Sequence, residues 1–272
     1  MDATTSRADA LRAEERKTFG NEMFSRGKLG AAIEAYSEAI TFDPNQSVYY
    51  TNRAMCFRKK ADWDAVIADC ETALLLEDTS IKGHYLLGVA LDAVGSDYAA
   101  AVVHLRRALE LCKDRTVSYK EDIQRAMLGA RKRQWEAEQA RAIPAFDEAD
   151  GWLQRTLGQQ QQQQQQSEDE AARVGAVVRH AIDASRAKCV PGRVPDYFTC
   201  RVTLEIMLDP VVAPSGITYE RSAIMQHLKQ NGNFDPVTRL ATEPSQLVPN
   251  IALKEAINQY LEECPWAYQC DD

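Results

Sequence analysis

Apolar residues in the first third of the chain recur with a helical spacing, and the whole pattern then repeats. The segment A-I-E-A-Y-S-E-A-I around Ala32 returns 34 residues later as V-I-A-D-C-E-T-A-L, and once more as A-V-V-H-L-R-R-A-L. A chain with this period stacks pairs of helices, whereas an ordinary amphipathic bundle shows only the 3.6-residue period. The sequence therefore predicts three helix pairs over residues 13–114.

The frame of this repeat is typical of tetratricopeptide repeats. With the first repeat starting at Ala13, small residues occupy position eight in all three repeats, as Gly20, Ala54 and Gly88. Position twenty of the first repeat is Ala32. At these two positions the helices of a pair come close together, and the stacked pairs form a concave groove for another chain.

Helical spacing continues beyond the repeats. We expect a long helix from about Asp122 to Pro144, which should end or kink it, and a second helical segment over 146–157. The glutamine run Gln159–Gln166 has no apolar face, so it predicts a mobile loop rather than an activation or aggregation element. A helix over 171–188 would complete a helical hairpin, whose apolar stripe can pack within one chain or against a second copy. The stripe consists of Leu153, Leu157, Val174, Val177, Val178 and Ile182.

The C-terminal part of the chain has a different pattern. The runs V-V-A and I-T-Y flank P-S-G at 214–216, which predicts a β-hairpin. Helical patterns cover 220–230 and 251–261, and F-D-P-V-T-R at 234–239 indicates a structured loop between them. Residues 193–266 are therefore predicted to form a small α+β module.

Composition narrows the class of protein. The net charge of −8 and the pI near 5.2 argue against nucleic acid as a partner, which requires a basic face. No run approaches the ~20 apolar residues of a membrane span, and residues 1–12 are polar, so we expect a flexible N-terminus and a cytoplasmic protein. Seven scattered cysteines favour reduced thiols over a disulfide framework, with Cys56, Cys70 and Cys112 in helix cores.

The small module lacks the ligands of a zinc domain. Residues 194–266 contain only Cys200, His227 and Cys264 as cysteines and histidines, without any C-x-x-C, so we expect neither zinc nor another cofactor. Polar side chains are expected to brace its loops instead. These are Glu205, Asp209, Ser215, Thr218, Glu220, Arg221, Asp235, Thr238, Arg239 and Asn250.

The sequence P-D-Y-F-T-C-R-V-T-L-E-I-M-L-D-P-V-V-A-P-S-G-I-T-Y-E-R, followed by F-D-P-V-T-R and Q-L-V-P-N, resembles a U-box. Joined to three tetratricopeptide repeats and a hairpin, it is similar over residues 13–266 to the CHIP-type family of chaperone-docking ubiquitin ligases. The resemblance implies a mostly α-helical fold with a zinc-free, RING-like α+β U-box over 193–266. It also implies chaperone binding by 13–114 and a homodimer formed through 115–188 and the U-box.

Four polar residues on the first helices of the repeats share the expected concave face: Lys17, Asn21, Asn52 and Lys82. Two cations and two amides suit a C-terminal aspartate, whose two carboxylates lie close together. By resemblance, these residues match the family's clamp for the acidic, aspartate-ending tails of the 70- and 90-kDa heat-shock chaperones. The resemblance adds Tyr85 and Leu86 as apolar contacts and Asp122 as a polar one.

Several enzyme classes are excluded by their missing motifs. There is no phosphate-binding glycine loop, no G-x-S-x-G and no H-E-x-x-H, and the four histidines are far apart in the sequence. Cys200 is an alternative thioester-forming nucleophile, although no histidine is near it in the sequence.

The resemblance instead implies a platform that docks a ubiquitin-charged conjugating enzyme and favours transfer to a client lysine. Val202, Leu204, Pro236 and Arg239 match the family's docking residues, and Arg239 matches the residue that restrains the ubiquitin thioester. The alternation around Val202 and Leu204 does not distinguish an inward from an outward face. If they point outward, Ile206 and Met207 are left to fill the core.

The leading hypothesis is a ubiquitin ligase and co-chaperone that marks misfolded clients for proteasomal degradation. The alternative is a non-catalytic chaperone adaptor with a degenerate U-box. The presence of Pro236 and Arg239 favours the ligase.

Overall fold

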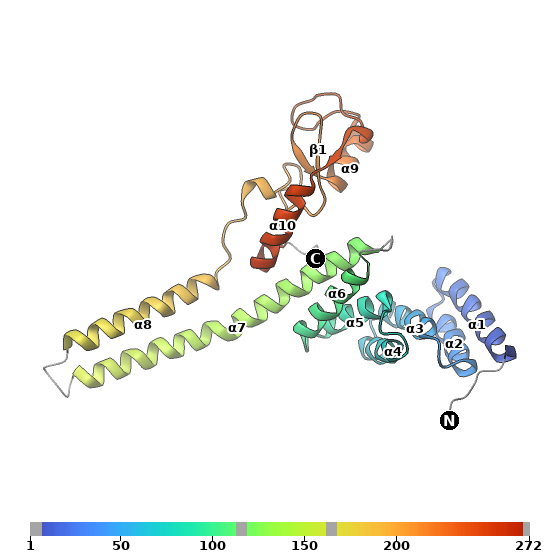
Figure 1. Cartoon of the computed structure of the whole chain (residues 1–272), viewed down its shortest axis with the longest axis horizontal. Helices are drawn as coiled ribbons and strands as arrows, with labels where there is room; N and C mark the ends of the chain where they lie inside the picture. Colours follow the sequence, from blue (N-terminus) through green and yellow to red (C-terminus); the bar gives the residue numbers. More distant parts are fainter. Residues whose placement is uncertain (1–6, 113–118, 162–167, 269–272) are drawn as a thin grey trace. The chain divides into compact units, whose positions relative to one another are not determined.

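The computed structural model describes residues 7–112, 119–161 and 168–268 of the chain (Figure 1). It divides into two compact units, Met1–Arg131 and Lys132–Asp272. Within the described ranges, no helix combines the length and the apolar character needed to cross a bilayer.

The first unit consists of the predicted helix pairs. Helices α3 and α5 begin 34 residues apart, at Ser47 and Ile81, as the repeat requires. The first helix begins at Arg7, six residues before the predicted start of the repeats at residue 13, and residues 1–6 lie outside the described ranges. The helices are α1 (Arg7–Ser25), α2 (Leu29–Phe42), α3 (Ser47–Lys59), α4 (Trp63–Leu76), α5 (Ile81–Val94) and α6 (Tyr98–Leu111).

The paired helices approach closely at the small residues that the sequence singled out. A Cβ atom added to Gly20 would lie 2.7 Å from the Tyr36 ring, and one added to Gly88 would lie 2.6 Å from Cγ of Leu105. Ala32 and Ala54 are fully buried. Because real Cβ atoms do not come this close to a neighbour, only glycine fits at Gly20 and Gly88 without a shift of the opposing side chain.

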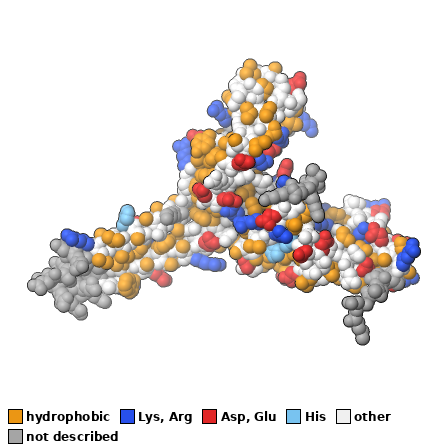
Figure 2. Space-filling model, in the orientation of Figure 1, with side chains coloured by type: hydrophobic (Ala, Val, Ile, Leu, Met, Phe, Trp, Pro, Cys, Tyr) orange, Lys and Arg blue, Asp and Glu red, His pale blue; other side chains and the backbone are white. Residues whose placement is uncertain are grey.

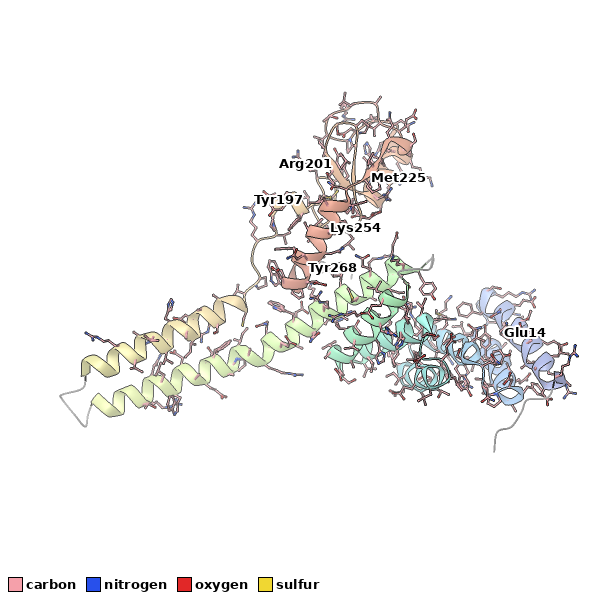
Figure 3. The ribbon with its side chains drawn as sticks, viewed as in Figure 1. Glu14, Tyr197, Arg201, Met225, Lys254 and Tyr268 are labelled. Carbon is pink, nitrogen blue, oxygen red and sulfur yellow. The ribbon has the colours of Figure 1, made fainter. Side chains whose placement is uncertain are left out.

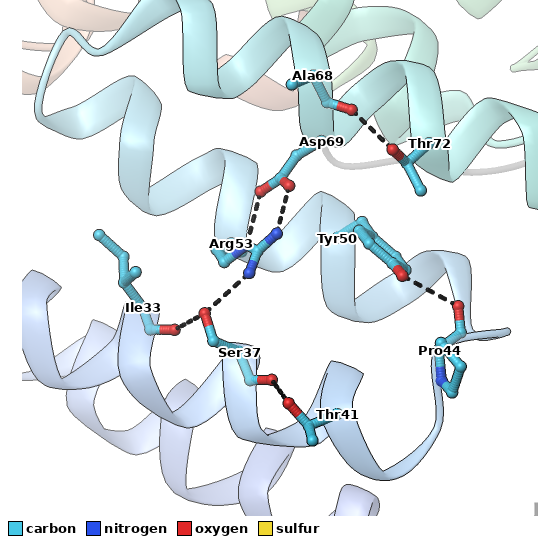
Figure 4. A network of polar contacts seen from close by, with 9 residues as sticks. All are labelled: Ile33, Ser37, Thr41, Pro44, Tyr50, Arg53, Ala68, Asp69 and Thr72. Carbon is cyan, nitrogen blue, oxygen red and sulfur yellow. Dashed lines mark hydrogen bonds and ion pairs between the residues drawn. The ribbon is translucent and has the colours of Figure 1, made fainter.

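A partly buried polar network, centred on an ion pair within the second helix pair, connects the first pair to the second (Figure 4). The guanidinium of Arg53 on α3 donates to both carboxylate oxygens of Asp69 on α4, at 2.9 and 2.7 Å, and to the hydroxyl of Ser37 on α2 at 2.8 Å. Bidentate geometry and the third hydrogen bond satisfy charges that would be costly to bury alone. This network fixes the packing of the first pair against the second.

The hairpin differs from the prediction at Pro144. Helix α7 (Lys120–Gln161) continues through Pro144, so the helix does not end there and the separate segment expected over 146–157 is wrong. A proline removes one backbone hydrogen bond from a helix. Because the residues on both sides of Pro144 are alanine-rich and favour helix, the helix can continue despite this loss. Gln159–Gln161 extend α7, and the rest of the glutamine run lies outside the described residues.

Helix α8 (Glu168–Lys188) forms the second arm of the hairpin and begins three residues before the predicted 171. Arg186 on α8 donates to the carboxylate of Asp147 on α7 at 2.7 Å. Leu153 is buried, whereas Val174 and Val177 are 58% and 70% exposed, so only part of the predicted apolar stripe is covered within the chain. The side chain of Leu157 lies outside the described residues.

The small module has the predicted hairpin and two helices. A three-stranded antiparallel sheet has the order β2-β1-β3, with Val211 paired to Tyr219. Both residues are fully buried, and Ile224, Ile257 and Leu261 from the helices pack into the core. The elements are η1 (Asp196–Phe198), β1 (Pro210–Val212), β2 (Thr218–Glu220), α9 (Arg221–Asn231), η2 (Pro244–Gln246), β3 (Val248–Pro249), α10 (Ile251–Glu263) and η3 (Pro265–Ala267).

We predict that Gly88→Ala destabilises the first unit by roughly 1–3 kcal/mol, because its methyl group would overpack Leu105. Gly30→Ala is the matched control: it also lies in a helix, but a Cβ there meets nothing within 4 Å, so the change should be neutral or stabilising. Urea unfolding followed by circular dichroism measures both. Equal effects at the two positions would contradict the close approach.

Candidate functional sites

A row of polar side chains crosses the first helices of the three repeats. Asn52 on α3 donates through Nδ2 to Oδ1 of Asn21 on α1 at 3.3 Å, and Lys82 on α5 donates to Oδ1 of Asn52 at 2.7 Å. The Tyr36 hydroxyl on α2 donates to the same Asn21 oxygen at 2.8 Å. The structure thus brings together three of the four predicted clamp residues, and we call Asn21, Asn52 and Lys82 the polar row.

The direction of these bonds decides what the row can bind. A lysine ammonium only donates, so the Asn52 oxygen must face Lys82 and its amide nitrogen must face Asn21. The Asn21 oxygen then accepts two bonds, and its Nδ2 donors have no partner among the described residues. Both ends of the row therefore present donors, which suits a ligand with several acceptor oxygens, such as a carboxylate.

Burial changes the titration of two groups in this row. Desolvation lowers the pKa of the Lys82 ammonium to about 8. Desolvation, with the nearby Cys56 thiol, raises the pKa of Tyr36 to about 12, so its hydroxyl remains a donor to Asn21 at physiological pH. Lys82 makes no ion pair in the part of the chain that the structure describes.

Lys17, the fourth predicted clamp residue, lies on α1 one turn before Asn21. Its ammonium pairs with the carboxylate of Glu14, which is labelled in Figure 3. The Lys17 side chain is partly buried and Glu14 is exposed. Because exposed ion pairs contribute little, this intrahelical pair can be exchanged for a ligand carboxylate at small cost.

The predicted apolar contacts lie deeper than expected. Leu86 is fully buried in the core of the third repeat, so the expectation that it contacts a ligand is wrong for this arrangement. Tyr85 is also largely buried, with its ring stacked on Tyr119 and the Arg58 guanidinium 5.2 Å from its centroid. Asp122 is exposed in the first turn of α7 and pairs with Arg125 at 2.6 Å.

Two loops of the small module share one backbone construction. In the first loop, residues 199–206, Cys200 N–H donates to the Glu205 carbonyl and Leu204 N–H to the Cys200 carbonyl, both at 2.8 Å. In the second loop, residues 234–241, Asp235 and Arg239 make the corresponding bonds at 2.8 and 3.0 Å. Leu204 and Arg239 occupy the equivalent place and both have left-handed backbones, with φ of 64° and 63°.

Two successive residues of β2 hold these loops. The Tyr219 hydroxyl donates to Asp235 of the second loop at 2.9 Å, and the Glu220 N–H donates to the Cys200 sulfur of the first loop at 3.3 Å. The Glu220 carboxylate accepts from the N–H groups of Leu208 and Asp209, at 2.7 and 3.0 Å. Both loops are therefore anchored on the same strand.

Asp235 is the fully buried centre of the second loop. Its carboxylate accepts from the hydroxyls of Ser215 and Tyr219 and from the N–H groups of Val237 and Thr238, at 2.6–2.9 Å. Desolvation raises the pKa of Asp235, but these four hydrogen bonds outweigh it and lower the pKa to about 2.

Charged pairs and caps supply the remaining bracing. Asp209 pairs with Arg221 on α9 and accepts from Lys254 on α10 at 2.9 Å; Lys254 is labelled in Figure 3. Asn250 caps α10 and donates to the Thr218 hydroxyl. These contacts confirm the predicted bracing for most of the side chains named from the sequence, whereas Glu205 and Arg239 make no side-chain hydrogen bond or ion pair in the described part of the chain. Within the described ranges, no three His, Cys, Asp or Glu side chains form a group that could hold a metal ion.

The structure decides which way the candidate docking residues point. Val202 and Leu204 are 43% and 76% exposed, while Ile206 and Met207 are buried in the core. Pro236 is half-buried, and Arg239 is exposed with its guanidinium 4.9 Å from the Phe234 ring centroid. The outward face of the first loop, which the sequence left open, therefore carries Val202 and Leu204.

Two further observations bear on the two loops. Val237 and Leu240 of the second loop are about half exposed, and the sequence analysis missed them because F-D-P-V-T-R-L gives no sign of their direction. Cys200 is fully buried with its sulfur accepting a backbone hydrogen bond, so this thiol is not placed to attack a thioester.

Comparison with known proteins gives two family matches. Residues 194–266 match the model of the U-box domain, and residues 20–55 match that of the TPR repeat. A relative from Arabidopsis thaliana, the E3 ubiquitin-protein ligase CHIP, is 40% identical over 268 residues, covering 94% of this chain and 96% of its own length. These matches confirm the resemblance identified from the motifs.

Solved structures also align with part of the chain. The TPR2B domain of yeast Sti1, in a complex with pHsp70, aligns with a TM-score of 0.42 and 27% identity, over 44% of this chain and 96% of that chain. The first TPR of Spaghetti (RPAP3), bound to the HSP90 peptide SRMEEVD, aligns with a TM-score of 0.39 and 26% identity, over 43% of this chain and 91% of that chain.

We predict that Asp235→Asn lowers the local stability of the small module by roughly 1–3 kcal/mol, because the amide would turn a donor toward the groups that donate to Asp235. Native-state hydrogen exchange at the β1 and β2 amides measures this stability. Asp196→Asn is the control, since its exposed carboxylate pairs only with the exposed Arg193.

The same experiment has a defined pH dependence. The folded-state pKa of Asp235 lies below its ordinary 3.8, so its stabilising effect is present above that value and is lost as the pH falls toward 2. The wild type should lose stability in this window more steeply than Asp235→Asn. Identical slopes would contradict the ionised, four-bonded carboxylate.

Proposed function

The chain belongs to the CHIP family of E3 ubiquitin-protein ligases, and we propose that its repeats bind the acidic C-terminal tails of 70- and 90-kDa heat-shock chaperones while its U-box docks a ubiquitin-conjugating enzyme. The observation that carries the tail-binding proposal is the polar row, whose hydrogen bonds leave donors at both ends. The ligase activity follows from the family, and the residue roles below are proposals.

The tail-binding site requires a ligand with clustered acceptors. A C-terminal aspartate carries a main-chain and a side-chain carboxylate, which can take hydrogen bonds from Lys82 at one end and from Asn21 and Lys17 at the other. The ligand would exchange with Glu14 at Lys17 but would meet no competing carboxylate at Lys82 in the described structure. Asp122 is proposed to add a polar contact from α7.

The proposed role of the U-box is to hold two reactants close together. Val202 and Leu204 in the first loop, with Pro236 in the second, form a partly apolar surface that a conjugating enzyme would cover. Arg239 is exposed and rests on Phe234, where it can reach a ubiquitin thioester carried by the docked enzyme. Transfer then goes directly from the enzyme's cysteine to a client lysine, with proximity and restraint as the contribution of the U-box.

The substrates proposed for this ligase are misfolded proteins held by the tethered chaperone, which are thereby marked for proteasomal degradation in the cytoplasm. The repeats and the U-box belong to different compact units, so a substitution in one site is not expected to disturb the other.

We also propose a homodimer. Figure 2 shows hydrophobic side chains on the visible surface of the hairpin and of the small module. On the hairpin, Trp152, Val174 and Val177 are each more than half exposed, and on the small module the neighbouring Val248 and Ile251 are 62% and 65% exposed. A second copy of the chain would cover these surfaces by the same contacts in both directions.

Light scattering at micromolar concentration should give twice the chain mass of 30.5 kDa. The double substitution Val177→Asp and Val248→Asp places a charge on each exposed surface and should shift the mass toward the monomer. A wild-type mass near 30.5 kDa would refute the dimer.

Tail binding can be tested at the two lysines. Lys17→Ala or Lys82→Ala should weaken the binding of an aspartate-ending peptide about ten- to a hundred-fold, since each charge-assisted contact contributes roughly 1.5–3 kcal/mol. Lys28→Ala, an exposed lysine in the turn between α1 and α2, is the control. Wild-type affinity in both clamp variants, measured by fluorescence anisotropy, would exclude this site.

The pKa of Lys82 adds a pH dependence. Carboxylate binding favours the charged ammonium, so the affinity should fall as the pH rises through about 8, and binding should take up a proton there. In Lys82→Ala this component of the pH dependence should be absent, whereas Lys17→Ala should retain it. A wild-type affinity that is constant from pH 7 to 9 would argue against a role for Lys82.

The docking surface can be tested by truncation. Leu204→Ala and Pro236→Ala should each remove most ubiquitin transfer without changing tail binding, because losing an interface anchor costs on the order of 2 kcal/mol or more. Leu75→Ala, which truncates an 88% exposed leucine on α4, is the control. Arg239→Ala should preserve docking but slow thioester discharge in a single-turnover assay. Wild-type transfer by both loop variants would exclude this docking surface, whereas absence of transfer by the wild type itself would favour the adaptor hypothesis.

A further inference from the structure

Two histidines that are 20 residues apart meet between α5 and α6. The Nδ1 atoms of His84 and His104 are 3.0 Å apart, and the two rings stack with their centroids 5.3 Å apart. The Nε2 atom of His84 is also 3.0 Å from the backbone carbonyl oxygen of Asp78. Neither histidine belongs to the sites described above, and the proposed function does not use the pair.

The contact with Asp78 fixes the proton of His84. A carbonyl only accepts, so Nε2 of His84 must carry a hydrogen, and in the neutral ring Nδ1 then has a free lone pair. The Nδ1 atom of His104 lies at hydrogen-bond distance from this nitrogen, 3.0 Å away. In metal sites, ligating histidines are oriented in the same way, by a backbone carbonyl or carboxylate on the other ring nitrogen.

The helices that carry the two rings are held rigidly together. Gly88 lies against Leu105, and the buried Leu86 and Leu105 belong to the same core. Both rings are partly exposed to solvent, so an ion can reach them.

From this geometry we infer that His84 and His104 form a two-histidine site for a divalent transition-metal ion. If His104 moves its proton to Nε2, rotation of the two rings can direct both Nδ1 lone pairs at one ion. With metal–nitrogen bonds of roughly 2.0–2.1 Å, a separation of 3.0 Å corresponds to a nitrogen–metal–nitrogen angle of roughly 90–100°. This angle suits cis positions of tetragonal Cu(II) or Ni(II).

The composition of the site limits which ions it can hold. No third histidine, cysteine or carboxylate joins the pair to form a group within the described ranges, so water or a small solute would complete the coordination. Imidazole ligands favour nickel, copper and zinc over magnesium and calcium, and affinity rises from manganese to copper. A bound ion would link α5 to α6 and stabilise the third repeat.

Ni(II) is the suitable probe because it does not oxidise the partly exposed thiols of Cys189 and Cys264. We expect calorimetry on the untagged, full-length chain at pH 7.5 to show one Ni(II) per chain. Saturating Ni(II) should raise the unfolding midpoint of the first unit. His84→Asn and His104→Asn should each weaken Ni(II) binding by about tenfold or more. In other metal sites, loss of a group that only orients a ligand already lowers the metal affinity by about this factor.

His180→Asn is the control, because His180 is a single exposed histidine on α8 and its removal should leave binding unchanged. Mg(II) should neither bind at this site nor raise the midpoint. Absence of stoichiometric Ni(II) binding, or equal loss in all three variants, would overturn the site and leave His84 and His104 as an interhelical hydrogen bond. Tail binding and ubiquitin transfer are measured separately, so their failure would not affect this result.

Discussion

The polar row of the repeats depends on how closely the helices of each pair approach one another. Gly20 has no side chain, so the Tyr36 ring can lie against α1 where even a methyl group would clash. There the Tyr36 hydroxyl donates a hydrogen bond to Asn21. Asn21 accepts a second hydrogen bond from Asn52, and Asn52 accepts one from Lys82. The orientation of the polar row is therefore set by packing between helices, before any ligand is present.

This arrangement has an energetic consequence for binding. Side chains that are already ordered by hydrogen bonds lose less freedom when a ligand arrives, so more of the interaction energy appears as affinity. The same hydrogen bonds restrict the chemistry of the ligand. They occupy the amide oxygens of Asn21 and Asn52, so the groups left to bind a ligand are N–H donors. The specificity that we propose for a carboxylate-rich chain end would thus follow from bond direction as well as from positive charge.

In the U-box, hydrogen bonds likewise fix the positions of residues in a candidate site. Its described residues include no converging group of metal ligands. Its two loops repeat one turn, and β2 anchors one through Cys200 and the other through Asp235. At the equivalent place in each turn, Leu204 and Arg239 adopt left-handed backbones, which cost of order 1–3 kcal/mol for residues other than glycine. The buried hydrogen bonds around Asp235 help to hold the second loop in this state. Both strained residues are among those proposed to meet the conjugating enzyme and its ubiquitin.

Local sequence patterns predict the helical repeats and the small α+β module, and they place Asn21, Asn52 and Lys82 in one candidate site. A 34-residue period and the turn signals around Pro214 and Gly216 are local patterns, and they do not depend on distant contacts. Tertiary structure decided the rest. Leu86 has the repeat position of a groove residue but is buried because neighbouring helices cover it, and Val202 and Leu204 point outward because Ile206 and Met207 fill the core. Helix α7 passes Pro144, which a local rule would make its end. The contact between His84 and His104 was hidden because two residues 20 apart meet only when α5 and α6 pack together.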